Sequence, residues 1–232
     1  MITVAKEPGV VLSAKGLSYA YGATAALRNV SLEVTRGEVV AVTGRSGSGK
    51  STLLHCLAGL LLPQEGEVWV GDRRLDSLSE AVRSALRLRS FGFVFQFGEL
   101  VPELSLVENV ELPLRLLGRR ARQTRGSALA MLDALGVAAL ADRRLSEVSG
   151  GEVQRAAVAR ALVHEPAVVF ADEPTGALDE SNATAVLDRL LGLARERGAG
   201  VVLVTHDEAV AAVADRRLVM RDGVLGAVGS LA

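Results

Sequence analysis

The pattern of hydrophobic and polar positions in the first third of the chain is that of short strands. Runs rich in β-branched and other apolar residues occupy positions 10–21, 29–34, 38–44 and 69–75, and Gly, Asn and Arg separate them. Such runs, bounded by turn residues, are typical of strands. We therefore expect the chain to begin with a first sheet built from these segments.

A second set of strands has a different pattern. Positions 38–43 form an apolar strand that leads into a glycine-rich loop, and positions 51–61 then have the length and spacing of a helix. Further strands fit positions 91–96, 167–172 and 200–206, which are apolar on both faces. Strands of this kind belong to parallel sheets that helices cover on either side, so the core is expected to be α/β.

The pattern changes to helices between Gln96 and about Ala161. Ser105 and Glu108 have the spacing of a capping box, and an amphipathic run over positions 121–135 stops at Gly136. We interpret this region as a helical insertion in the α/β core. Near the end of the chain, Asp222 and Gly223 form the strongest two-residue turn signal and predict a hairpin.

Composition limits the classes of function. A length of 232 residues fits one domain with a sizeable insertion, and 49% hydrophobic with 23% charged residues is typical of a globular protein. The 26 basic and 27 acidic residues give a net charge of -1, so no global field attracts nucleic acid. We expect no nucleic-acid partner.

The N-terminal residues and the longest apolar stretch bear on the location of the protein. The N-terminal residues 1–9 lack the apolar core of a signal peptide, and the longest apolar stretch, near positions 53–62, is about half of the ~20 residues that a membrane span needs. A single cysteine, Cys56, suits a reducing compartment. We expect a cytoplasmic chain that neither crosses a bilayer nor is exported.

One loop predicts a phosphate site. It follows the apolar strand at positions 38–43, precedes a helix, and matches the eight-residue P-loop pattern with Gly44, Arg45, Ser46, Gly47, Ser48, Gly49, Lys50 and Ser51. Glycines let backbone N–H groups converge on phosphate oxygens, Lys50 can reach the β and γ phosphates, and the Ser51 hydroxyl can bind Mg²⁺. The chain has only two other lysines, Lys6 and Lys15. ATP with Mg²⁺ is the expected ligand.

Polar residues at strand ends complete the candidate site. An apolar strand ends in Asp172 and Glu173, which could hold Mg²⁺ and activate a water, respectively. Gln96 and His206 also end strands, at the edge where open α/β sheets bind ligands. Each feature alone has a plain structural explanation, since acidic turns and polar residues at strand ends are common; the combination with the P-loop favours function.

A further segment identifies a family resemblance. Ser149, Gly150, Gly151 and Glu152, followed by Val153-Gln154-Arg155, resemble the signature motif of ATP-binding cassette (ABC) ATPases. Tyr21, the P-loop, Gln96, this motif, Asp172-Glu173, a D-loop at positions 176–179 and His206 stand in the family's order. The resemblance implies a P-loop NTPase (RecA-like) core with an N-terminal antiparallel β-subdomain, over positions 1–96 and 162–232. It also implies an inserted α-helical subdomain, over positions 97–161, within a single domain spanning 1–232.

The resemblance also implies roles for individual residues. Tyr21, followed by Gly22, would stack on adenine, with Tyr19 as the competing aromatic, and Thr52 would join the P-loop in binding nucleotide. Gln96, Ser51 and Asp172 would contact Mg²⁺, and Gln96 would relay its state to the membrane partner. Asp179 would couple two sites, and His206 would contact the γ-phosphate beside the general base Glu173.

Partners follow from the same resemblance. Residues 149–152 of one copy would close on the γ-phosphate held by another copy, in a head-to-tail dimer that sandwiches two ATP molecules. The dimer would drive a separately encoded membrane permease from the inner face of the membrane. The sequence segments around Gln96, Glu108 and Leu112 resemble those of the ABC ATPases that serve lipoprotein release and macrolide export. Glu152 and Val148 depart from the usual Gln and Leu, which leaves the dimer's affinity for ATP open.

Two other functions compete with transport. The cell-division ATPase of the same branch suggests a nucleotide-gated regulatory clamp on a membrane complex, and the motifs do not separate it from a transporter subunit. DNA-repair and translation ATPases share the signature but carry long coiled coils or tandem cassettes, for which this chain has no room. His55, Cys56 and His164 lack metal-ligand spacing and are expected to pack.

Overall fold

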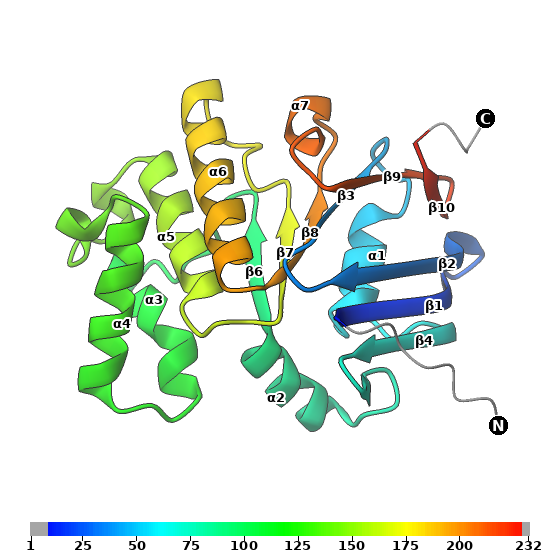
Figure 1. The fold of residues 1–232 in the computed structure, drawn as a ribbon, viewed down its shortest axis with the longest axis horizontal. Helices are drawn as coiled ribbons and strands as arrows, with labels where there is room; N and C mark the ends of the chain where they lie inside the picture. Colours follow the sequence, from blue (N-terminus) through cyan, green and yellow to red (C-terminus); the bar gives the residue numbers. More distant parts are fainter. Residues whose placement is uncertain (1–8, 229–232) are drawn as a thin grey trace.

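The computed structural model of the protein describes residues 9–228 and contains two sheets (Figure 1). The smaller sheet has four antiparallel strands in the order β2-β1-β4-β5. They are β1 (Val10–Tyr21), β2 (Thr24–Thr35), β4 (Glu65–Val70) and β5 (Arg73–Arg74). The first sheet expected from the strand-like runs is therefore present.

The larger sheet has six strands in the order β10-β9-β3-β8-β7-β6. Its members are β3 (Val39–Thr43), β6 (Phe91–Phe95), β7 (Val168–Asp172), β8 (Gly200–Val204), β9 (Arg216–Arg221) and β10 (Val224–Ala227). All pairs are parallel except β9 with β10. The expectation that positions 38–44 belong to the first sheet is wrong, because β3 pairs with β8 and β9 in this one.

Seven α-helices accompany the sheets in the described part of the chain. They are α1 (Lys50–Leu57), α2 (Glu80–Ser90), α3 (Leu106–Leu116), α4 (Ala121–Ala134), α5 (Gly150–Leu162), α6 (Glu180–Glu196) and α7 (Glu208–Ala211). Two 3₁₀ turns, Ala138–Leu140 and Leu145–Glu147, lie between α4 and α5. Figure 1 shows α3, α4 and α5 gathered on one side, away from the smaller sheet.

The core divides into two clusters, one on each face of the larger sheet. Val40 and Val42 of β3 pack with α1 and the smaller sheet, whereas Val39 packs with the cluster that contains α3, α5 and α6. Successive strand residues point to opposite faces, and all five residues of β3 and of β8 are buried. Burial on both faces explains why these strands are apolar throughout.

Local signals near the ends of two elements are confirmed. Ser105 caps α3, since its Oγ accepts a hydrogen bond from Glu108 N at 3.4 Å while Glu108 Oε2 accepts one from Ser105 N at 2.9 Å. Asp222 and Gly223 take positive φ angles of 48° and 80° between β9 and β10, as a tight hairpin turn requires. Between residues 9 and 228, no helix is both long and apolar enough to cross a bilayer.

Candidate functional site

A cavity of about 680 Å³ opens where β3 and β7 end. It is lined by residues at the end of β1 and the start of β2, in the loop before α1, at the start of α1, at the end of β7, and in the segments after β7 and β8. The lining residues predicted from sequence are Tyr21, Ser46, Gly47, Gly49, Lys50, Ser51, Thr52, Asp172, Glu173 and His206, and Thr24, Ala25 and Ala26 join them. Most of the candidate site residues therefore meet in one place.

Close backbone approaches fix the shape of the loop between β3 and α1. A methyl group at Gly44 would lie 2.3 Å from the carbonyl oxygen of Met220, and one at Gly49 would lie 2.3 Å from that of Ala26. Both glycines also have positive φ, of 148° and 110°. Only glycine fits at these two positions, so the loop is held against β9 and β2 in one conformation.

Lys50 lies at the first position of α1 and is buried. Its ammonium donates hydrogen bonds to the carbonyl oxygens of Gly44, at 2.7 Å, and Arg45, at 3.0 Å. An ammonium has three donors, so one remains for an anionic ligand. The arrangement fits a phosphate oxygen bound between this lysine and the start of α1.

Asp172 ends β7 beside the first turn of α1. Burial, followed by the neighbouring charge of Glu173, raises the pKa of the Asp172 carboxyl, while a hydrogen bond from the Ser51 side chain and the charges of His55 and Lys50 oppose the rise. A hydroxyl and a carboxylate in contact are the hard oxygen ligands that Mg²⁺ prefers. The residues present therefore fit Mg²⁺, although residues 9–228 contain no cluster of three or more His, Cys, Asp or Glu side chains that would hold a metal ion without a ligand.

The Glu173 side chain is held in place by two residues on the segment after β8, Thr205 and His206. Its Oε2 accepts a hydrogen bond from Thr205 Oγ1 at 3.0 Å, and its Oε1 accepts one from His206 N at 3.0 Å and lies 2.6 Å from His206 Nδ1. The backbone of Glu173 has a positive φ of 48°, which is costly for a residue with a side chain. Thr205 was not among the predicted site residues, although it is buried and stands directly before His206 at the end of the strand pattern.

The two tyrosines differ in their exposure. Tyr21 is 54% exposed and lines the cavity, whereas Tyr19 is partly buried and packs against the smaller-sheet cluster. Their rings meet edge to face, with centroids 5.0 Å apart. Tyr21 is thus the ring that a planar ligand in the cavity can reach.

Several predicted residues lie outside this cavity. Gly44, Arg45 and Ser48 line an adjoining cavity of about 440 Å³ with residues 219–222. Gln96 lines neither, and its amide rests against the turn after Glu173, since a methyl group at Gly176 would lie 3.0 Å from Gln96 Nε2.

The signature residues also lie apart from the cavity lining. Ser149 caps α5: its backbone N and its Oγ donate to Glu152 Oε2 at 2.7 and 2.8 Å. Asp179 caps α6 by accepting hydrogen bonds from Asn182 at 3.0 and 2.6 Å. Arg155 Nη1 of α5 donates a hydrogen bond to Asn182 Oδ1 of α6 at 3.4 Å, which connects the first turns of the two helices.

Comparison with known proteins gives the family. The profile of the ABC transporter family matches residues 27–176. The chain is 45% identical over 227 residues to the lipoprotein-releasing system ATP-binding protein LolD of Xanthomonas campestris pv. campestris strain 8004, covering 96% of this chain and 95% of that protein. It is 43% identical to the LolD protein of Xanthomonas oryzae pv. oryzae strain MAFF 311018, covering 97% and 94%.

Solved structures agree. The dimeric, post-hydrolysis state of the ATP-binding cassette MJ0796 bound to ADP and Pi is 36% identical with a TM-score of 0.84, covering 94% of this chain and 98% of that chain. The cbiO1 protein of Clostridium perfringens, part of the ABC transporter complex cbiONQ, is 30% identical with a TM-score of 0.86, covering 94% and 87%. The chain therefore belongs to the ABC transporter family, as an ATP-binding subunit that hydrolyses ATP.

Proposed function

We propose that this subunit powers the release of lipoproteins from a membrane, through a separate permease and a second copy of itself. The observation that carries the proposal is the 45% identity over 96% of the chain to a lipoprotein-releasing system ATP-binding protein. The regulatory clamp remains the competing outcome of the test, because both would use the same ATP chemistry.

The cavity residues would share the work on ATP. Tyr21 would stack on adenine, and the loop from Gly44 to Ser51, with Thr52, would bind the phosphates. Glu173 would accept a proton from the attacking water, oriented by its contacts with Thr205 and His206. His206 would also contact the γ-phosphate. Since phosphoryl transfer is mainly a matter of positioning and electrostatics, fixed side chains are sufficient.

Mg²⁺ would be held with the nucleotide by Ser51 and Asp172, which already contact each other. Bound there, the ion neutralises charge on the phosphates. Gln96 would approach from the end of β6, where its amide lies against the turn that carries Gly176. The position of the Gln96 side chain would therefore depend on whether the ion is bound, and the rest of the chain would respond to that position.

The dimer explains why the signature residues stand apart. Ser149, Gly150, Gly151 and Glu152 do not line the cavity of their own chain. The cap at Ser149 begins α5, whose N-terminus can attract an anion from another molecule. A two-fold pair of chains would let each copy complete the site of the other, with Asp179 near the junction.

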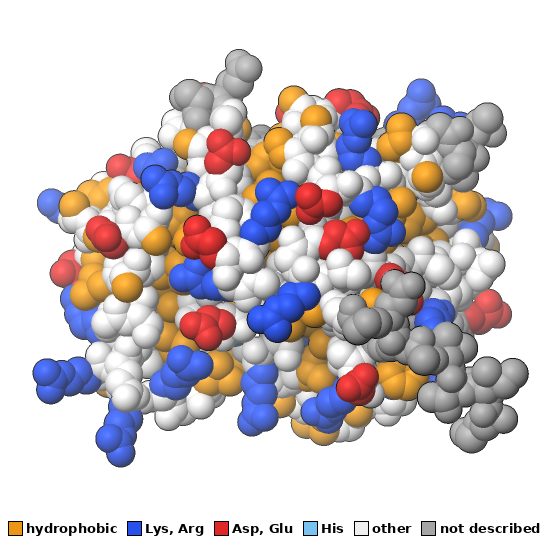
Figure 2. Space-filling view, viewed as in Figure 1, with side chains coloured by type: hydrophobic (Ala, Val, Ile, Leu, Met, Phe, Trp, Pro, Cys, Tyr) orange, Lys and Arg blue, Asp and Glu red, His pale blue; other side chains and the backbone are white. Residues whose placement is uncertain are grey.

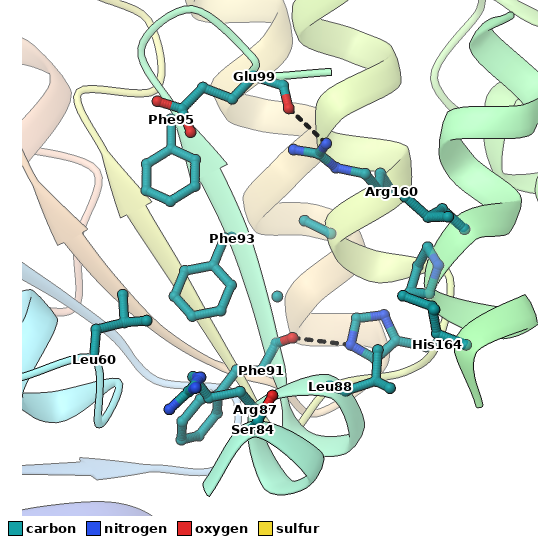
Figure 3. A pocket seen from close by; sticks show the side chains of 15 residues that line it. Leu60, Ser84, Arg87, Leu88, Phe91, Phe93, Phe95, Glu99, Arg160 and His164 are labelled. Carbon is teal, nitrogen blue, oxygen red and sulfur yellow. Dashed lines mark hydrogen bonds between the residues drawn. The ribbon is translucent and has the colours of Figure 1, made fainter. Parts of the chain in front are cut away.

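The permease would dock on a groove of about 650 Å³ between α2, β6, α3 and α5 (Figure 3). Phe91, Phe93 and Phe95 project from one face of β6 into it, across from Leu60. An apolar helix could bury such a row in the way that amphipathic helices fill grooves. Of the apolar and acidic segment at positions 98–108, which leads from β6 into α3, only Glu99 lines the groove. The groove supports treating positions 97–161 as a helical insertion that receives the permease.

A basic edge next to the groove supports a place on the inner face of the membrane. Arg119 and Arg120, between α3 and α4, and Arg122, in the first turn of α4, are exposed, and no ion pair to them occurs within residues 9–228. Figure 2 shows Lys and Arg side chains projecting from the lower edge of the molecule, beneath α3 and α4. Anionic lipid headgroups on the cytoplasmic leaflet attract such residues.

The experiment is reconstitution. The chain and its permease, incorporated in lipid vesicles that carry a lipoprotein, should release the lipoprotein only when ATP and Mg²⁺ are present. The variant Glu173→Gln is the matched control and should release none. ATP hydrolysis that responds to the permease without any release would favour the regulatory clamp instead.

A further inference from the structure

Gln154 occupies the second turn of α5 with its side chain 2% exposed. Its Nε2 donates hydrogen bonds to two backbone carbonyl oxygens, those of Phe95 at 2.8 Å and Pro174 at 2.6 Å. Because both partners are acceptors, the amide has only one orientation that satisfies them, with its NH₂ group toward both. A buried amide that bonds the chain at the ends of two strands fixes the position of both segments relative to α5.

Each carbonyl stands next to a residue with a proposed role at the nucleotide. Phe95 is the last residue of β6 and precedes Gln96, and Pro174 follows Glu173. The strands β6 and β7 are neighbours, with Phe95 opposite Asp172 in their register. One side chain of α5 therefore connects the segments that carry Gln96 and Glu173.

The same helix holds the chain after Gln96 at a second point. Arg160 donates to the carbonyl oxygens of Gly98, at 2.9 Å, and Glu99, at 2.7 Å, and Figure 3 draws the latter bond. Gly98 and Glu99 both have positive φ, of 72° and 47°. A methyl group on Gly98 would lie 3.2 Å from Val153 Cγ1, so this loop lies directly on α5. Gln154 and Arg160 thus attach the Gln96 loop to both halves of one helix.

We propose that Gln154 is a positioning residue that transmits the placement of α5 to Gln96 and Glu173 together, with Arg160 as the second attachment of the Gln96 loop. Resting on the proposed roles of Gln96, Glu173 and the signature residues, the link would work as follows. When the nucleotide of a second copy reaches Ser149 at the start of α5, movement of the helix shifts the Phe95 and Pro174 carbonyls with it. The residue that would contact Mg²⁺, Gln96, and the general base, Glu173, are then positioned by one event.

The test is a double-mutant cycle between Gln154→Leu and Gln96→Ala, with kcat and the KM for ATP as readouts. Leucine keeps the apolar part of the side chain and removes the donor. We expect Gln154→Leu to lower kcat about 10-fold or more, the scale of losses when a supporting partner is removed. The KM should stay within about twofold, because the P-loop is untouched. In the Gln96→Ala background the same change should cost much less, because the two residues act in series.

Two controls separate positioning from folding. Val158→Ala removes buried volume from the same helix without touching either carbonyl, so it should lower the melting temperature and leave kcat unchanged. Gln154→Lys restores a donor and should recover part of kcat. If Gln154→Leu does not fold, Arg160→Lys tests the other attachment, since lysine keeps the charge but cannot bond both carbonyls as a fork.

The outcomes distinguish this inference from the proposed function. A wild-type kcat in Gln154→Leu, or an equal loss in the presence and absence of Gln96, would overturn the link while leaving the ATP chemistry intact. Normal turnover in Glu173→Gln would instead overturn the assigned roles on which the link rests.

Discussion

Glu173 Oε1 lies 2.6 Å from His206 Nδ1 and also accepts a hydrogen bond from the backbone N of His206. The carboxylate is thereby held at the edge of the cavity by a residue from a neighbouring strand, and Thr205 Oγ1 holds its other oxygen. A positioned base needs such support, because its orientation decides whether it can accept a proton.

Glu173→Gln should leave ATP binding intact and reduce turnover by about 10²-fold or more, the contribution of a positioned general base. Glutamine has nearly the same shape and can still accept a hydrogen bond from Thr205, so the fold should not change. Steady-state hydrolysis and binding of a fluorescent ATP analogue would be measured on the same preparation. Turnover equal to the wild type would exclude Glu173 as the base.

Lys50→Ala should abolish nucleotide binding rather than turnover alone. The ammonium supplies positive charge within the cavity and ties the carbonyls of Gly44 and Arg45 together, so its loss removes charge and loosens the loop. Isothermal titration with ATP and Mg²⁺ tests this, with Lys15→Ala as a control for loss of a lysine elsewhere. Normal binding by the Lys50 variant would show that the phosphate site lies in another part of the chain.

The strands around the site were predictable because they are apolar on both faces. The runs at positions 91–96, 167–172 and 200–206 correspond to β6, β7 and β8 within two residues. The sheet to which β3 belongs was not predictable. The residues that β3 pairs with, Val201 and Arg216, are more than a hundred residues away in the sequence. Local pattern carries no information about which distant strand will pair.

Helix α2 was missed for a different reason. Among its residues only Arg83 and Leu86 are buried, and Arg83 and Arg87 are both paired with Glu80 at 2.5 Å. A helix that covers the core with arginine stems and ion pairs is so polar in composition that its few apolar positions do not stand out in the sequence.

The position of the Gln96 amide against Gly176 was not predictable either, because it is a contact between distant segments that no local spacing encodes.

Glu152→Gln should strengthen the ATP-dependent dimer. The carboxylate accepts bonds from Ser149 N and Oγ, which lower the pKa of Glu152 and keep it charged at the start of α5. Glutamine retains an acceptor for the cap and removes a negative charge from the place where a second copy's phosphate would bind. We expect a dimer dissociation constant about two- to fivefold lower, an effect that salt should weaken. Sedimentation in the Glu173→Gln background measures it, and a weaker dimer would contradict the proposal.

Replacing Arg119, Arg120 and Arg122 together with glutamine should weaken binding to anionic vesicles. Each basic residue near such a surface contributes about 1 kcal/mol, so the triple change should lower partitioning by about 10²-fold. Flotation with phosphatidylglycerol vesicles at low and high salt is the measurement. A matched triple of exposed arginines on other elements, Arg28, Arg189 and Arg217, serves as the control. Equal losses for both triples would leave only a general charge effect and would contradict the orientation toward the membrane.

Asp215→Asn should destabilise the fold in a pH-dependent way. The hydrogen bond from Val39 N to Asp215 Oδ2, at 2.8 Å, together with the ion pair to Arg195 at 2.9 Å, holds the pKa of the Asp215 carboxyl below its ordinary value of 3.8. A depressed folded-state pKa means that the stabilisation is fully present above pH 3.8 and is lost as pH falls through the lower, folded-state pKa.

The stability difference between wild type and Asp215→Asn should therefore stay constant from neutral pH down to about pH 5 and shrink toward zero below pH 3.8. Urea unfolding followed by circular dichroism over this range measures it. Arg195→Gln removes only the half-exposed ion pair, so it should cost less and depend on salt. A difference that widens as the pH falls would show that the carboxylate is stabilised more in the unfolded chain, and the tie between β3 and the start of β9 would then have another cause.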